Sequence, residues 1–165
     1  MLKPLTQFYC DTCGEIIDSP EEGWIEWIAD YNDSLSYEIH SFRIVHHFTH
    51  SPIALETNEG CYQHAGKSGR SDTGLRHFIN DDYKMAYILQ FLDIGSYHDP
   101  NYKGSKLTDM RQYVETVRRI TTPYYEEARR YWDRAIEDGF FIDINDISIF
   151  GKHNLKRIIE IYGDK

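Results

Sequence analysis

The sequence predicts an α+β fold in which a small antiparallel β-sheet is followed by a bundle of four to five helices. Up to about residue 70, apolar and polar residues alternate with the period of two expected for strands that bury one face. From residue 72 onwards the apolar residues recur at helical spacing. We therefore expect residues 1–70 to form a β-rich, metal-binding module and residues 71–165 to form a helical part packed on it. Together the two parts are expected to form one structural unit of ordinary domain size.

Two short motifs in the β-rich part have the spacing of metal ligands. Cys10 and Cys13 are separated by two residues, and Cys61 and His64 have the same separation; together they use all three cysteines of the chain. Two ligands at this spacing in a tight turn can point at one ion, and Gly14 lets the backbone fold away beneath it. The sequence therefore predicts a structural Zn²⁺ site of the Cys3His type.

Three other histidines offer alternative ligands. If His64 turns away, we expect His46 or His47 to replace it, and these residues with His50 would also suffice for a second site. A histidine in a strand is more often a core or rim residue than a ligand. Cys10, Cys13, Cys61 and His64 therefore remain the predicted set.

The strands are expected in this order along the chain. Residues 5–17 form a hairpin around the first motif, and the aromatic and β-branched segments 24–31 and 37–48 form two antiparallel strands. Residues 49–74, which include four glycines and Pro52, form an irregular connection that returns to the metal.

The helices follow from apolar stripes at spacings of three and four. These stripes lie in residues 75–79, 85–92, 110–120, 125–136 and 155–162. Thr108 and Thr122 are the expected caps of the third and fourth helices. Residues 96–107 are expected to be a loop, and the apolar run 140–144 is a candidate strand.

Charge and composition limit the classes of partner. The chain has a net charge of −9, of which −7 belongs to residues 1–70. An acidic surface repels phosphates, so we do not expect a nucleic acid as partner. Thirteen tyrosines and three tryptophans favour recognition of another protein.

The sequence also bears on location. No apolar run is long enough to cross a membrane, and the first residues lack an apolar leader segment. An odd number of cysteines, two of them in CxxC, fits metal binding in a reducing compartment, and we expect a cytoplasmic protein. A redox role for CxxC is disfavoured, because Gly14 and further turn residues follow it where a redox motif would open a helix.

The motifs Cys10-Asp-Thr-Cys13 and Cys61-Tyr-Gln-His64 resemble those of zinc-ribbon and treble-clef modules, over residues 8–65. The resemblance implies that the zinc has a structural role. The first functional hypothesis is therefore a non-enzymatic intracellular zinc-binding protein that acts as an interaction or regulatory module.

Two other hypotheses remain. The order of His46, His47, Asn58 and the second motif also resembles HNH nucleases, which implies that His47 is the general base, His46 a ligand of a catalytic metal and Asn58 an orienting residue. Alternatively, the acidic, aromatic-rich chain could occupy the nucleic-acid-binding site of a partner protein.

Overall fold

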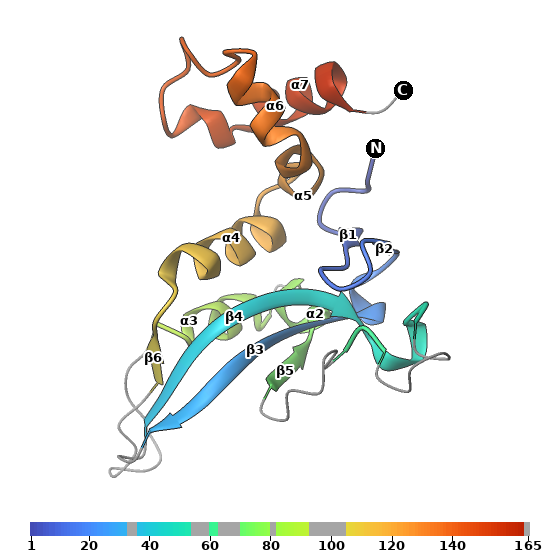
Figure 1. Cartoon of the computed structure of the whole chain (residues 1–165), viewed down its shortest axis with the longest axis vertical. Helices are drawn as coiled ribbons and strands as arrows, with labels where there is room; N and C mark the ends of the chain where they lie inside the picture. The colour runs from blue at the N-terminus through green and yellow to red at the C-terminus, as the bar shows by residue number, and fades with distance from the viewer. Residues whose placement is uncertain (33–35, 54–59, 63–69, 80–81, 93–104, 164–165) are drawn as a thin grey trace.

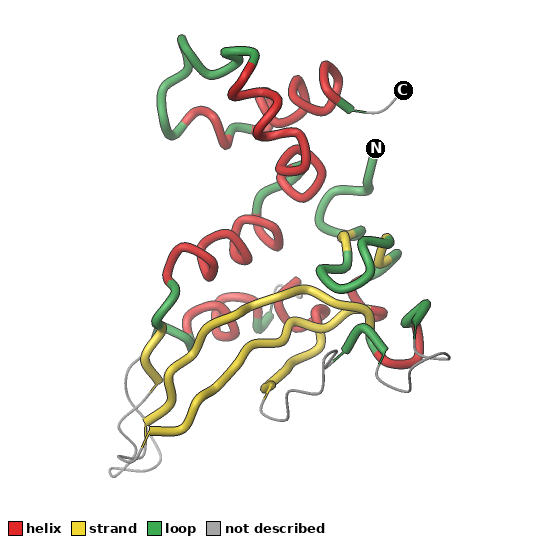
Figure 2. Tube along the Cα trace, in the orientation of Figure 1, coloured by secondary structure: helices red, strands yellow, loops and turns green. Residues whose placement is uncertain are grey.

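The structure, a computed structural model, confirms the α+β class: helices follow a mixed sheet, and part of them packs on it (Figures 1 and 2). It describes residues 1–32, 36–53, 60–62, 70–79, 82–92 and 105–163. In Figure 1 the main sheet lies at one end of the molecule, helices α5 to α7 lie at the other, and α4 lies between them.

A two-stranded hairpin at the N-terminus matches the prediction. Strand β1 (Phe8–Tyr9) pairs in antiparallel register with β2 (Ile16–Ile17), with Phe8 opposite Ile17. Both of these side chains are fully buried, so the hairpin is anchored by its apolar face. The turn between the strands carries Cys10 and Cys13.

The main sheet has strand order β5-β3-β4-β6. Its strands are β3 (Gly23–Asn32), β4 (Ser36–His46), β5 (Arg70–Gly74) and β6 (Ser105–Leu107). The β3–β4 hairpin was predicted, but β5 and β6 lie in segments that were expected to be irregular. Both are edge strands, and β6 pairs parallel to β4. Polar β5 and three-residue β6 show no alternating apolar pattern, because strand pairing rather than a continuous buried face defines them.

The helices of the second half agree with the stripes over residues 75–79, 110–120 and 155–162, whereas the stripes over 85–92 and 125–136 give shorter helices than expected. The helices are α2 (Leu75–Ile79), α3 (Lys84–Leu89), α4 (Met110–Thr121), α5 (Tyr125–Ala128), α6 (Trp132–Glu137) and α7 (Lys152–Tyr162). Single 3₁₀ turns lie at Pro20–Glu22, Phe48–His50, Arg129–Tyr131 and Ser148–Phe150. Among the described residues, no helix combines the length and the apolar character needed to cross a membrane.

Several local predictions were wrong. The carboxylate of Asp109, rather than the predicted Thr108, caps α4 by accepting a hydrogen bond from the Gln112 backbone N–H at 2.9 Å. The predicted helix 125–136 is divided by the turn Arg129–Tyr131. Residues 140–144 form turns rather than a strand, since they close the short connection from α6 by local hydrogen bonds.

Some apolar side chains assigned to inner helix faces are exposed instead. They are Met85, Leu89, Leu92, Met110 and Ile136. Their neighbours Phe91 and Ala135 take the buried positions. Short helices present only about one inward position per turn, so a stripe read over two turns overestimates the buried face.

The buried apolar residues form two clusters. The first joins the sheets to α2, α3 and α4, and its centre is an aromatic group made by Trp27, Phe42, Phe91 and Tyr113. The second is built by α5, α6 and α7. The boundary between the two apolar clusters therefore falls after α4 in the chain. The predicted division of the chain at residue 70 stays a prediction.

A buried arginine connects the first hairpin to the helices. Arg119 of α4 is 4% exposed and donates to Glu126 at 2.6 and 2.9 Å, to the Asp11 carboxylate at 2.6 Å and to the Tyr9 carbonyl at 2.9 Å. Asp11 also accepts from the Ile44 backbone N–H at 2.7 Å. Asp11 and Glu126 hold the pKa of Arg119 above its usual range although burial opposes the charge. One charged network thus joins the hairpin, β4, α4 and α5.

Replacing Arg119 by Met should destabilise the protein strongly. The substitution keeps the apolar stem but leaves two carboxylates without their buried partner, which costs about 3–5 kcal/mol. Urea unfolding measures the loss, with Arg111→Ala as a control because Arg111 is exposed on the same helix. Equal stability of the two variants would show that the network does not hold the parts together.

Candidate metal centre

Four side chains converge at the end of the main sheet. The ligand atoms of Cys10, Cys13, His46 and Cys61 all lie within 4.8 Å of one another. Ligand atoms around a tetrahedral zinc ion are separated by about 3.5–3.8 Å, so a small contraction would complete the site. The three thiols are free of disulfides. Cys10, His46 and Cys61 are buried at 2%, 4% and 0% exposure.

The turn after β1 is shaped to present its two thiols. Gly14 has φ of +80°, and its N–H donates to the Cys10 carbonyl at 2.9 Å. The Cys10 N–H donates to the Glu15 carbonyl at 2.9 Å, which closes the turn. The Thr12 N–H points at the Cys10 sulfur at 3.4 Å. A side chain at Gly14 would strain this left-handed backbone, so the glycine supports the turn as the sequence indicated.

His46 is the last residue of β4, and a hydrogen bond to the backbone of β2 orients its ring. Its Nε2–H donates to the Ile16 carbonyl at 3.2 Å, while Nδ1 lies 3.5 Å from the Cys13 sulfur. Because a carbonyl oxygen can only accept, this bond places the proton of the neutral ring on Nε2. Nδ1 is then left with its lone pair toward the thiols, which is the arrangement of a histidine ligand with an outer hydrogen-bond partner.

Cys61 comes from a distant part of the chain and is held by two hydroxyl groups. The Ser51 hydroxyl donates to its sulfur at 3.1 Å and accepts from its backbone N–H at 2.8 Å. The Thr12 hydroxyl donates to its carbonyl at 3.1 Å. Thr12 lies between the two cysteines of the first motif, so it links both halves of the cluster directly.

The protonation of the thiols reflects their crowding. Burial raises the pKa of Cys61 to about 12 and also raises that of Cys13. Burial opposes ionisation of Cys10 too, but the His46 ring and the N–H groups of Cys13 and Thr12 lower the pKa of Cys10 to about 6. Burial lowers the pKa of His46, but the contact with Cys10 raises it above its usual value. A divalent cation would supply the charge that allows all three thiolates to form together.

The structure brings together three of the four predicted ligands. His64 lies outside the described residues, as does Asn58 of the nuclease hypothesis. The fourth ligand atom in the described part of the chain belongs to His46, one of the two expected replacements. Its signal in the sequence was the alternation Phe42, Ile44, His46, which places the ring on the buried face at the end of the strand.

The other two candidate histidines lie apart from this cluster. The His47 ring stacks on Trp24 with centroids 5.3 Å apart, and its Nδ1 accepts from the Thr49 N–H at 3.3 Å. The Thr49 hydroxyl also contacts Nδ1 of His50 at 3.0 Å. These contacts explain both rings as parts of the turn that follows β4.

Comparisons with known proteins give no further guide, because no family model, curated protein or solved structure matches the chain.

His46 and His64 are the two candidates for the fourth metal ligand, and matched variants distinguish between them. His46→Ala should weaken Co²⁺ binding by more than about 100-fold, since loss of a ligand exceeds the 10–100-fold effect typical of an outer-shell partner. His64→Ala should keep the affinity and the visible absorption of tetrahedral thiolate-bound cobalt. Cobalt titration followed by absorption measures both. The reverse result would assign the fourth ligand to His64.

Proposed function

We propose that Cys10, Cys13, His46 and Cys61 bind one structural Zn²⁺ ion. The observation that carries this proposal is the convergence of three thiols and an oriented imidazole within 4.8 Å in a mostly buried site. Thiolate and imidazole ligands in a set of four suit zinc better than the hard cations, which take oxygen ligands. A set of four protein ligands also leaves no open coordination position for a substrate.

The ion would join three segments that are distant in the sequence. It would link the first hairpin to the end of β4 and to Cys61 beyond a long connection. Closing such loops is entropically unfavourable, and the free energy of metal binding offsets this cost. Through Asp11, which lies between the two cysteines of the hairpin, the same ion would support the network around Arg119.

On this basis the protein is a non-enzymatic, zinc-stabilised interaction or regulatory module. Its free thiols and proposed zinc suit a reducing compartment such as the cytoplasm. Its net charge of −9 favours a partner that is a protein rather than a nucleic acid. The same charge is compatible with the alternative in which the protein occupies a partner's nucleic-acid-binding site.

Removing the metal should unfold the first half of the chain. A chelator should lower the melting temperature markedly, and added Zn²⁺ should restore it, because the binding free energy contributes to folding. Cys13→Ser should give the low melting temperature even with zinc present. Calorimetry with elemental analysis measures both effects. Unchanged melting after complete removal of the metal would exclude a structural role.

The nuclease hypothesis is less well supported by the geometry. His46 lies among the cysteines rather than beside a separate cation, and His47 is engaged by Trp24 and Thr49. We expect no cleavage of plasmid DNA by the zinc-loaded protein with Mg²⁺ or Mn²⁺, measured by gel electrophoresis. Cleavage that requires the divalent ion and is lost in His47→Ala would revive this hypothesis and overturn the non-enzymatic assignment.

A further inference from the structure

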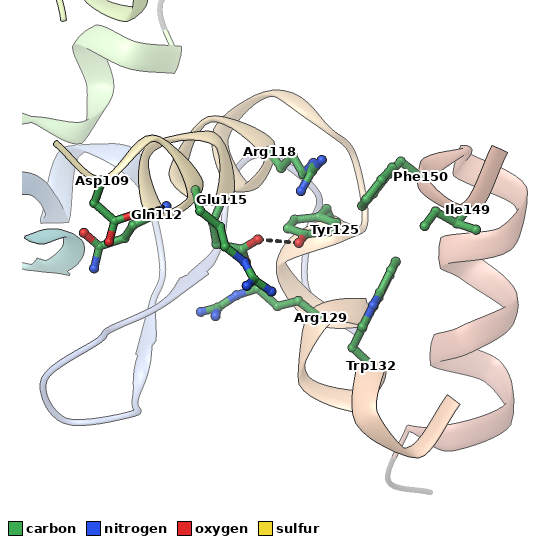
Figure 3. A pocket seen from close by; sticks show the side chains of 10 residues that line it. Asp109, Gln112, Glu115, Arg118, Tyr125, Arg129, Trp132, Ile149 and Phe150 are labelled. Atoms are coloured by element: carbon green, nitrogen blue, oxygen red, sulfur yellow. Dashed lines mark hydrogen bonds between the residues drawn. The ribbon is translucent and has the colours of Figure 1, made fainter. Parts of the chain in front are cut away.

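Two neighbouring cavities lie along α4, away from the metal ligands. The larger, of about 630 Å³, lies between α4 and the α5–α7 part of the chain (Figure 3). The smaller, of about 350 Å³, lies between α4 and the strands β4 and β5. Gln112 and Glu115 line both of them, so the cavities adjoin across one face of the helix. We call the two together the arginine groove.

The charge of this groove differs from that of the rest of the chain. Six arginines and no lysine line it, together with three carboxylates. The arginines are Arg43, Arg70, Arg111, Arg118, Arg119 and Arg129. With Glu26 and Glu126, which pair with Arg43, Arg119 and Arg129 from behind the lining, the groove has a net charge of +1, whereas the remaining residues of this −9 chain carry −10. Guanidinium groups match phosphate and carboxylate oxygens in two-bond geometry and also stack on rings.

Part of this donor capacity is unused within the described residues. Arg43 pairs with Glu26 at 2.6 Å through Nε, but its buried Nη2 has no hydrogen-bond partner there. The buried Nε of Arg70 also lacks a partner, although its Nη1 donates to the Ser41 carbonyl at 3.1 Å. Ser41 itself has φ of +58°, a rare conformation for a residue other than glycine. Both atoms are thus unpaired polar groups in the wall of the smaller cavity.

The larger cavity also has an aromatic side. Trp132 and Phe150 stack with centroids 5.6 Å apart and planes at 12°, and Arg118 lies 4.0 Å from the centre of the Phe150 ring. In Figure 3 these rings face the polar side chains of Glu115 and Arg129 across the cavity. The lining thus offers an apolar surface for a ring and cationic groups for an anion.

We propose that the arginine groove binds a small ligand that joins an aromatic ring to a phosphate group, of the class of nucleoside phosphates. The ring packs beside Trp132 and Phe150, and the phosphate accepts hydrogen bonds from the arginines. The cavity volumes lie in the range of small-molecule sites. The −10 charge of the other residues repels a nucleic acid or an acidic protein that approaches over a wide surface more strongly than it repels a small anion that enters the groove.

This inference goes beyond the proposed zinc function and is tested on zinc-loaded protein whose metal content has been measured. Isothermal titration with the four common ribonucleoside mono- and diphosphates should find at least one that binds with a Kd below about 1 mM. Its nucleoside and its sugar phosphate alone should each bind at least about tenfold more weakly, because each lacks one of the two recognised groups.

Variants locate the binding in the groove. Arg111→Ala and Arg70→Ala should each raise the Kd of the nucleotide by at least about tenfold, because each removes a charge-assisted hydrogen bond. Arg76→Ala is the matched control, since Arg76 is exposed on α2 and lines neither cavity of the groove. Melting curves check that all three variants are folded.

Three results would overturn the proposal. One is the absence of binding by every nucleotide in the set. Another is equal weakening in the Arg76→Ala control, which would mean a diffuse charge effect. The third is binding of a single-stranded oligonucleotide or a polyglutamate peptide at least tenfold more tightly than of any nucleotide, which would assign the groove to a macromolecular partner.

Discussion

The fold depends on the short turn between Cys10 and Cys13, because this turn takes part in two sets of interactions. Its sulfur atoms meet His46 and Cys61 within 4.8 Å. Its Asp11 carboxylate, between those sulfur atoms in sequence, accepts from the Ile44 N–H at 2.7 Å and from Arg119 at 2.6 Å. A displacement of the turn would therefore disturb the end of the sheet and the contact with the helices together. The candidate metal site and the docked helices are therefore connected through one carboxylate.

The contacts of Asp11 also matter because the apolar core is divided into two clusters. The first apolar cluster includes the sheets and α4, and the second includes α5 to α7. Polar contacts join α5 to the hairpin and to the residues before it, since Glu126 accepts from the Tyr9 N–H at 2.8 Å and Glu127 accepts from the Leu2 N–H at 2.6 Å. Asp11 also lines the arginine groove. The proposed zinc ion would thus fix one wall of the groove as well as the hairpin.

The sequence was sufficient for features that depend on local patterns. The hairpin, the β3–β4 pair and α7 followed from alternation and helical spacing, and the cysteines followed from their motif. The parallel strand β6 was missed because pairing with β4 across a long sequence separation leaves no local pattern. The burial of Arg119 was not predicted, because its partners Asp11 and Glu126 are brought together only by the tertiary fold. His46 was named as a substitute ligand, but only the structure placed it beside the thiols.

The central claim is that one zinc ion joins the hairpin, β4 and Cys61 through three sulfur atoms and one nitrogen. X-ray absorption at the zinc edge of the purified, full-length protein tests it most directly. We predict one equivalent of zinc per chain. Its spectrum should show three sulfur ligands at about 2.3 Å and one nitrogen ligand at about 2.0–2.1 Å. A shell dominated by oxygen or nitrogen, or less than about half an equivalent of zinc in protein prepared without chelators, would contradict the claim.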